Sequence, residues 1–349
     1  MFAGKGLVFG APHRCELEQV ELDEAALQPG ELIVQNECTM VSAGTEVANF
    51  TGLDPGTRTP GSWNTYPHRP GYGGIGLVVA LGPELPGEPW KHAVGDRVFA
   101  ITKHAHYSVA DAARRPVVPV REDDDARSLV LARMASVSIS ALRKASCVEL
   151  GGRAVVVGLG LVGIFAAQLL QLGGMQVLGL DRSEPRVKMA EGTGVSALAV
   201  GVPPERDAVV AAFGGHRPDL VVEATGVPDV AAIAVSLARD GGEVVLLGTP
   251  RGEYHGDATS LLAEIHHRGL RLIGALEWLL PLRSGTWEAR WSLQEDYRVL
   301  FDSLRSGRLL TAGLVSDVAL PDQAPAMYAK LAAEGPSMGA VLINWVGHP

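Results

Sequence analysis

Residues 155–163 read Val-Val-Val-Gly-Leu-Gly-Leu-Val-Gly and are the most informative segment of this 349-residue chain. The three valines predict a buried strand, and the apolar residues around and after the last glycine predict a helix. Between two such elements, a G-x-G-x-x-G pattern is typical of a dinucleotide-binding turn. Gly158 allows the tight turn, Gly160 lets the backbone approach a pyrophosphate, and Gly163 lets the helix pack on the strand. The segment therefore predicts a nucleotide site at a helix N-terminus.

An acidic residue follows at the expected place. Asp181 ends the next predicted strand, 176–180, about 20 residues beyond the glycine turn. A carboxylate there accepts hydrogen bonds from the adenosine ribose and would repel a 2′-phosphate, so Asp181 favours NAD(H) over NADP(H). Arg182 tempers this preference, because an arginine beside that position can serve NADP. The alternative interpretation is a glycine turn plus a helix-capping aspartate.

The remaining sequence predicts an α/β fold with two domains. From residue 153 onward, strands and helices alternate, which indicates a doubly wound parallel sheet. The predicted strands are 154–157, 176–180, 219–223, 243–247 and 270–274. The first ~130 residues contain short apolar runs between Gly and Pro residues and predict a β-rich domain. A helix is expected over 126–146, and the charged run 121–125 is interpreted as a solvated loop or a helix start.

Composition excludes several functions. The net charge of −9 argues against binding to nucleic acid or to an anionic membrane surface. No apolar stretch is long enough to span a bilayer, and the first residues lack a secretory signal, so a cytoplasmic protein is expected. The three cysteines, Cys15, Cys38 and Cys147, are far apart and predict reduced thiols rather than disulfides.

Several phrases, in order along nearly the whole chain, resemble the medium-chain dehydrogenase/reductase superfamily, which has the alcohol dehydrogenase architecture. They are 42–46 (SAGTE), 70–76 (PGYGGIG), 94–98 (VGDRV), 157–163 (VGLGLVG), 223–226 (EATG) and 241–243 (GGE). The resemblance implies a GroES-like catalytic domain formed by 1–131 and 311–349, with a Rossmann NAD-binding domain at 132–310. It also implies a homodimer.

The departures from this pattern concern zinc. In the zinc enzymes of the superfamily, a cysteine stands where this chain has Ala43, and His-Glu stand where it has Tyr72 and Gly73. The third ligand region, 133–135, has no cysteine or aspartate. Alanine and glycine offer no side-chain ligand, so we expect no zinc at the usual place. The chain resembles a zinc-lacking branch that includes bacterial glycoside and sugar dehydrogenases and bacteriochlorophyllide dehydrogenase-like proteins.

Without a metal, side chains must handle the substrate proton. By its family position, Thr45 is a hydroxyl relay, and the Tyr72 phenol is a donor in the vacated site. Lys103 is a candidate base, because a partly desolvated lysine has a lowered pKa. His104 can titrate near neutrality, and Glu46 matches an acidic position of the family that has no zinc-bound histidine to orient in this chain. Each residue also has a structural interpretation. Thr45 would cap a turn and Lys103 would be an ordinary surface lysine. His104 would be a half-exposed strand histidine, and Glu46 a structural carboxylate.

Cofactor and substrate contacts follow from the same resemblance. The cofactor candidates are Gly158, Gly160, Leu161, Val162, Gly163, Asp181, Arg182, Arg186, Ala224, Thr225, Leu247, Thr249, Leu276 and Glu277. The substrate candidates are mainly aromatic, because indole and phenol rings stack against the C–H face of a sugar: Trp63, Tyr66, His68, Trp278, Trp287 and Trp291. Alternatively, the tryptophans seal a dimer interface.

Together these residues predict a zinc-independent, NAD(H)-dependent oxidoreductase. It would interconvert a secondary alcohol and a ketone on a sugar, cyclitol or glycoside-like metabolite. Three alternatives stay open: an enoyl- or quinone-type reductase, an epimerase that oxidises its substrate transiently, and a non-catalytic NAD(H)-binding protein. Asp181 speaks against the first, because such reductases commonly prefer NADPH.

Overall fold

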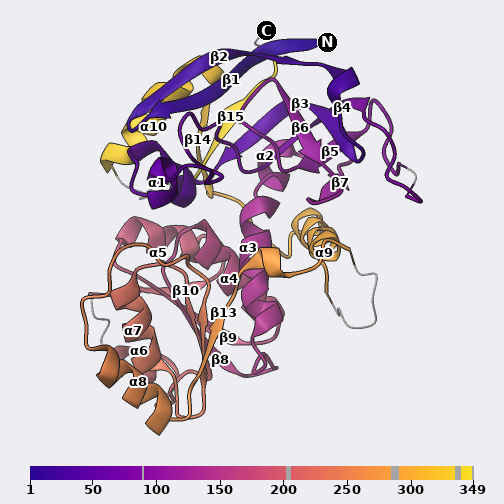
Figure 1. Ribbon diagram of the computed structural model, residues 1–349. Coiled ribbons are helices and arrows are strands. Elements are labelled where there is room, and N and C mark those ends of the chain that lie inside the picture. Colours follow the sequence, from indigo (N-terminus) through magenta and orange to yellow (C-terminus); the bar gives the residue numbers. More distant parts are fainter. Residues whose placement is uncertain (89, 202–205, 284–290, 335–338, 348–349) are drawn as a thin grey trace. The chain divides into compact units, whose positions relative to one another are not determined.

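The computed structural model describes residues 1–88, 90–201, 206–283, 291–334 and 339–347 (Figure 1). The chain forms two compact units. Unit 1 comprises Met1–Arg133, Leu282–Phe301 and Val315–Pro349, and unit 2 comprises Met134–Pro281 and Asp302–Leu314. Helices α3 (Ala132–Lys144) and α9 (Leu293–Arg305) each contribute residues to both units.

Unit 1 is built on a mainly antiparallel sheet with the strand order β14-β15-β3-β4-β5-β7, in which β6 also pairs with β3. The strands are β3 (Glu31–Val41), β4 (Gly74–Leu81), β5 (Arg97–Ala100), β6 (Tyr107–Asp111), β7 (Val117–Pro119), β14 (Val315–Ala319) and β15 (Ala340–Asn344). A separate hairpin joins β1 (Phe2–Ala11) to β2 (Arg14–Leu22). The β-rich first domain predicted from the sequence is therefore confirmed.

Two helices of unit 1 close on a shared apolar core. They are α1 (Ala43–Thr51) and α10 (Ala324–Glu334), which contact each other although they lie far apart in the sequence. Phe9 of β1 packs edge-on against Tyr328 of α10, with ring centroids 4.9 Å apart, and against Phe50 of α1 at 5.5 Å. This packing brings the first turn of α1 beside the polar tip of Tyr328.

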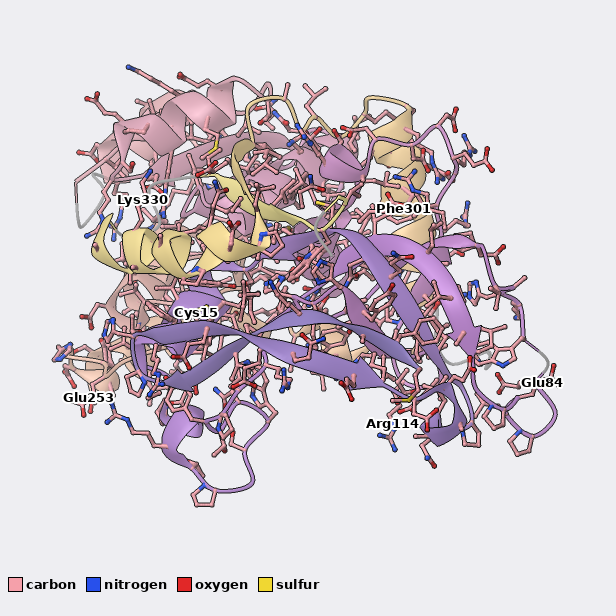
Figure 2. All side chains as sticks on the ribbon, turned by 90° about the horizontal axis from the view of Figure 1, so that it is seen from above. Cys15, Glu84, Arg114, Glu253, Phe301 and Lys330 are labelled. Atoms are coloured by element: carbon pink, nitrogen blue, oxygen red, sulfur yellow. The ribbon has the colours of Figure 1, made fainter. Side chains whose placement is uncertain are left out.

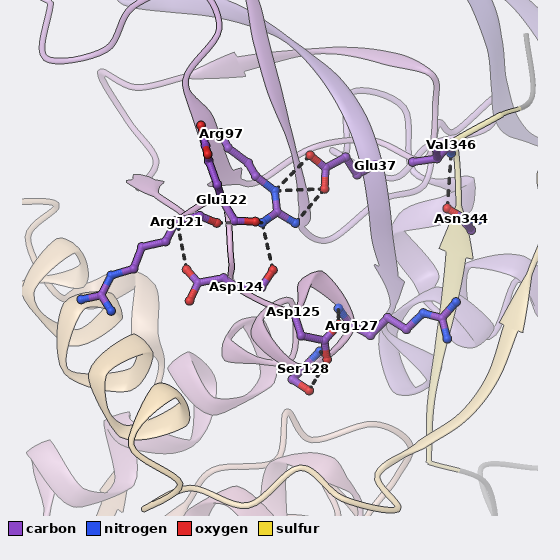
Figure 3. Close-up of polar contacts among 10 residues, drawn as sticks. All are labelled: Glu37, Arg97, Arg121, Glu122, Asp124, Asp125, Arg127, Ser128, Asn344 and Val346. Carbon is purple, nitrogen blue, oxygen red and sulfur yellow. Dashed lines mark hydrogen bonds and ion pairs between the residues drawn. The ribbon is translucent and has the colours of Figure 1, made fainter.

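The charged run 121–125 is more ordered than a solvated loop (Figure 3). The Arg97 side chain pairs with Glu37 at 2.8 Å and donates hydrogen bonds to the backbone oxygens of Arg121 and Asp124. Asp125 caps the short helix α2 (Ala126–Leu129) by accepting backbone hydrogen bonds. The run is thus a helix start anchored by an arginine, and the helix expected over 126–146 is two helices, α2 and α3.

Unit 2 contains a parallel sheet with the strand order β10-β9-β8-β11-β12-β13. The strands are β8 (Arg153–Val157), β9 (Gln176–Asp181), β10 (Ser196–Ala199), β11 (Leu220–Glu223), β12 (Glu243–Leu246) and β13 (Arg271–Gly274). Strand β8 lies at the centre, and the order reverses there, because β9 and β11 flank it on opposite sides. Ligands of doubly wound sheets bind at such a switch point. This confirms the predicted fold class.

Helices connect the strands of unit 2. They are α4 (Leu161–Leu172), α5 (Glu184–Glu191), α6 (Arg206–Ala212), α7 (Pro228–Leu237) and α8 (Ala258–His267). Helix α4 packs on β8 and β9, and α7 packs on β11 and α8 (Figure 1). The sequence analysis did not predict β10, whose Ser-Ala-Leu-Ala composition has little β-propensity.

The two units and the predicted domains place their boundaries differently, by a few residues at 132–133 and 311–314 and over the longer segment 282–301. Residues 282–301 fall in the predicted dinucleotide domain but cluster with unit 1. The reason is aromatic packing: the rings of Tyr297 and Phe301 lie 4.8 and 6.0 Å from that of Phe99 in β5. Within the described part of the chain, every helix is too short or too polar to cross a bilayer.

Candidate functional site

The glycine turn after β8 has a geometry that requires its glycines. Gly158 has a φ of +96°, a left-handed conformation that favours glycine. A Cβ at Gly163 would lie 1.8 Å from the Gly158 carbonyl oxygen, so only glycine allows α4 to approach the turn this closely. A Cβ at Gly160, the N-cap of α4, would meet no heavy atom within 4 Å. The turn thus leaves open space at the helix N-terminus, beside Leu161 and Val162.

Asp181 connects the end of β9 to this turn. Its carboxylate, which is 3% exposed, accepts hydrogen bonds from the backbone N–H of Leu159 at 2.8 Å and of Ser183 at 2.9 Å. Arg186 forms an ion pair with it at 3.4 Å, whereas Arg182 is exposed. The carboxylate therefore lies next to the glycine turn, with part of its charge balanced.

The other cofactor candidates of unit 2 follow the neighbouring strands. Residue Glu223, at the end of β11, accepts hydrogen bonds from the N–H of Thr225 at 2.6 Å and of Gly226, and its burial raises its pKa. A Cβ at Gly226 would lie 2.3 Å from the Thr249 oxygen, so the loops after β11 and β12 touch. These loops contain Ala224, Thr225, Leu247 and Thr249, and they lie at the same carboxyl edge as the glycine turn.

The last two cofactor candidates follow β13. Leu276 is half exposed and is the N-cap of a short 3₁₀-helix. Glu277 is buried, and its carboxylate accepts a hydrogen bond from the Ser136 hydroxyl at 3.0 Å. Glu277 therefore anchors this segment to α3.

Unit 1 contains a buried triad made of Glu46, His104 and Tyr328, which we call the carboxylate triad. One oxygen of Glu46 lies 2.9 Å from Nε2 of His104 and accepts a hydrogen bond from the Tyr328 hydroxyl. The other oxygen accepts a hydrogen bond from the Ser42 N–H at 3.1 Å. The residues are 2%, 0% and 0% exposed. Charge interaction and hydrogen bonding with His104, together with the other donors, outweigh burial and lower the pKa of Glu46.

The second ring nitrogen of His104 is also engaged. Nδ1 lies 2.7 Å from the Thr39 hydroxyl, which accepts a hydrogen bond from the Trp345 indole N–H at 2.9 Å. Both predicted catalytic groups of the triad are thus enclosed, and neither reaches a substrate in this arrangement. Because its ring nitrogens have partners on both sides, His104 offers no position to a metal ion.

Lys103 stands on a rigid turn with its side chain exposed. Its N–H donates to the Ser108 hydroxyl at 2.9 Å, and its carbonyl accepts a hydrogen bond from the Asn36 amide at 3.2 Å. A Cβ at Gly71 would lie 2.3 Å from the Lys103 Cα, so the backbones pack closely there. Surrounding protein lowers the pKa of Lys103, an effect that the Glu46 charge opposes.

The zinc-ligand positions of the superfamily contain groups that do not fit a zinc ion. The Arg133 guanidinium lies 3.9 Å from the centre of the Tyr72 ring, and its Nε donates to the Tyr72 carbonyl at 3.0 Å. Gly73 makes room for it, because a Cβ there would lie 3.3 Å from the arginine stem. A permanent positive charge on this ring disfavours a divalent cation. No three His, Cys, Asp or Glu side chains group as metal ligands in the described ranges.

The remaining candidates lie on separate segments. Thr45 is half-buried in the first turn of α1. Trp63 is 68% exposed, and its ring lies 5.5 Å from the buried His68. The Tyr66 hydroxyl donates to the Asn49 carbonyl. Trp278 and Trp291 are half-buried, and Trp287 lies outside the described residues.

Four residues near these groups were not singled out from the sequence: Thr39, Arg133, Tyr328 and Trp345. Each meets its partner through contacts across the chain, as between Tyr328 and Glu46, 282 positions apart. Arg133 carries one local signal, a charged residue at the start of an otherwise apolar helical turn. The other three have none, because their neighbours are ordinary strand and helix residues.

Comparisons with known proteins agree with this architecture. Residues 162–289 match the family model for zinc-binding dehydrogenases. The chain is 28% identical to L-threonine 3-dehydrogenase of Bacillus subtilis over 36% of its own length and 35% of that protein. It is 29% identical to L-galactonate-5-dehydrogenase of Escherichia coli over 45% of its length and 47% of that protein. The matched segments thus span less than half of either relative.

A solved structure matches nearly the whole fold. Galactitol-1-phosphate dehydrogenase of Escherichia coli superposes with a TM-score of 0.80, covering 97% of this chain and 99% of that one at 16% identity. At this identity the likeness concerns the fold.

Proposed function

We propose that this chain is a member of the medium-chain dehydrogenase/reductase superfamily and acts as a zinc-independent, NAD(H)-dependent oxidoreductase. It would interconvert a secondary alcohol and a ketone on a sugar, cyclitol or glycoside-like substrate. The proposal that the mechanism uses no metal ion rests on one observation. The Arg133 guanidinium stacks on the Tyr72 ring, at the positions where zinc ligands stand in the superfamily.

NAD(H) fits the residues of unit 2. The open space at Gly160 and the free N–H groups at the start of α4 suit a pyrophosphate. Asp181 would accept hydrogen bonds from the adenosine ribose and repel a 2′-phosphate. Ala224, Thr225, Leu247 and Thr249 would contact the cofactor from neighbouring loops. When bound, the nicotinamide would accept a hydride from the alcohol or return it to the ketone.

Lys103 is the residue that we propose moves the substrate proton. In the oxidation direction, its neutral amine accepts the hydroxyl proton as the C–H hydride leaves; in reduction, its ammonium returns that proton to the oxygen. Its lowered pKa raises the fraction of neutral amine near physiological pH. Thr45, on α1, would relay the proton. Glu46 and His104, which are enclosed in the carboxylate triad, take a supporting role.

Aromatic side chains support the substrate class. The exposed Trp63 offers an indole face on which the C–H side of a sugar ring can stack. Two of the similar proteins are named for galactonate and galactitol phosphate, which are polyhydroxylated compounds.

We also propose a homodimer, because the edge strand β13 exposes Leu272, with Leu276 and Leu279 beyond it.

The test is a substrate screen. Sugars, cyclitols, polyols and glycosides are incubated with NAD⁺ and the purified protein, and NADH formation is followed by absorbance before and after treatment with a chelator. We expect turnover of a polyhydroxylated compound that the chelator does not change. Activity that a chelator abolishes and zinc restores would refute the metal-free mechanism, and turnover of enones alone would favour a reductase.

A further inference from the structure

The carboxylate triad and the turn that carries Lys103 are parts of one rigid assembly. His104 follows Lys103 directly, and its backbone N–H donates to the Pro70 carbonyl at 2.9 Å. Its ring lies 2.9 Å from Glu46, which Tyr328 holds from α10. Because the side chains of the triad are closed off from solvent, the Glu46 carboxylate keeps a fixed place relative to Lys103.

The charges around Lys103 come from three segments. Glu46 of α1 and His68, in the segment before β4, interact electrostatically with Lys103, and His104 follows it directly in its own turn. Burial, followed by the lysine charge, lowers the pKa of His68 to about 4, so His68 is neutral at physiological pH. Cys15 of β2 and Tyr328 face Glu46; burial and this carboxylate raise both pKa values, that of Cys15 to about 12. Glu46 therefore supplies the negative charge in this group.

We propose that the carboxylate triad is a positioning device for Lys103: it fixes an ionised Glu46 beside the lysine turn and so stabilises the ammonium form of the lysine. This inference rests on the proposed function for the meaning of Lys103 as a proton carrier. Glu46 and Tyr328 are positioning residues in this scheme, since neither reaches the reacting atoms. Tyr328 has a direct part, because its hydroxyl is one of the donors that keep the carboxylate ionised.

Competitive acetylation tests the proposal without cofactor or substrate. The full-length protein is treated with trace acetic anhydride between about pH 6 and pH 11, a span that covers the ordinary lysine range. Mass spectrometry of the peptides gives the pH midpoint for each lysine. Lys330, exposed on α10, is the internal reference (Figure 2). In Glu46→Gln, we expect the Lys103 midpoint to fall by about half a unit or more, because an opposite charge is lost.

Two further variants complete the design. Glu46→Asp keeps the charge and is expected to hold the Lys103 midpoint near that of the wild type. If Glu46→Gln does not fold, the paired variant Glu46→Gln/His104→Gln replaces both partners with amides and should show the same fall. A Lys103 midpoint that stays at its wild-type value in the folded neutral variant overturns the inference, as does an equal fall in Glu46→Asp. Neither result affects the proposed function, which the activity of Lys103 variants tests separately.

Discussion

Gly163 lies so close to Gly158 that a Cβ on Gly163 would be only 1.8 Å from the Gly158 carbonyl oxygen. No rotamer change relieves such a clash, because both atoms belong to backbone-fixed positions. We therefore expect Gly163→Ala to displace α4 from β8, to lower the melting temperature by several degrees and to abolish NAD⁺ binding. Differential scanning fluorimetry and calorimetric titration measure the two effects.

Gly160→Ala is the matched control for this prediction. Gly160 has a φ of −71°, which alanine adopts readily, and its Cβ would meet open space. The free protein should therefore keep its melting temperature, whereas NAD⁺ affinity should drop about tenfold or more as the methyl group meets the pyrophosphate. Unchanged affinity in Gly160→Ala would show that the dinucleotide does not lie over this turn.

Asp181 is predicted to set the cofactor preference. Asp181→Ala should raise the KM for NAD⁺ about tenfold, because a charged hydrogen bond to the ribose is lost. The preference for NAD⁺ over NADP⁺ should also become smaller, because the carboxylate no longer repels a 2′-phosphate. Asp181→Asn keeps an acceptor for the Leu159 N–H and so separates anchoring of the turn from charge. If the ratio of kcat/KM for the two cofactors is the same in all three proteins, the assignment fails.

Lys103 is predicted to be essential for turnover. Lys103→Met should lower kcat about 100-fold or more with little change in the melting temperature, since the side chain is exposed and general acid–base catalysis contributes this much. Lys330→Met, which removes an exposed lysine from α10, should have wild-type kinetics. Full kcat in Lys103→Met would remove the lysine from the mechanism.

The fold was predictable where local pattern and packing agree. The valines of β8 and the glycines after them indicate a strand, turn and helix, and Asp181 follows at the end of β9. Strand β10 escaped prediction because its four residues have no β-branched side chain, and its place at the sheet edge comes from pairing with β9. The packing of Tyr297 and Phe301 on Phe99 joins residues about 200 positions apart, which no local periodicity reveals.

The site was predictable only in part for the same reason. Lys103, His104 and Glu46 were found through their family positions, but their environments were not. That His104 and Glu46 form an enclosed pair depends on Tyr328 and Thr39, which reach them from α10 and β3. Likewise, the loss of zinc ligands was readable at Tyr72 and Gly73, whereas the guanidinium that takes up the space follows from the packing of Arg133.

The proposed homodimer makes the edge strand β13 a target. Leu272 is 46% exposed there, and β13 has a strand partner on one side only among the described residues. Leu272→Arg should therefore convert a dimer to a monomer, because like charges would face each other across a two-fold axis. Light scattering after size exclusion gives the mass. A variant that remains dimeric would place the interface elsewhere, and a monomeric wild type would contradict the proposal.

His68 is predicted to make the folded state sensitive to acid. Its side chain is buried, and its pKa in the folded protein is lowered to about 4 from an ordinary value of 6.5. Between these values the unfolded chain binds the extra proton, so the contribution of His68 to stability is complete above pH 6.5 and declines as the pH falls toward 4. The loss amounts to at most about 3 kcal/mol.

His68→Phe keeps a ring against Phe9 and Trp63 but cannot be protonated. The free energy of unfolding, measured with urea for both proteins across this range, should fall more steeply in the wild type. Carboxylates common to both proteins cancel in the difference, and parallel curves would show that the His68 ring is not held neutral.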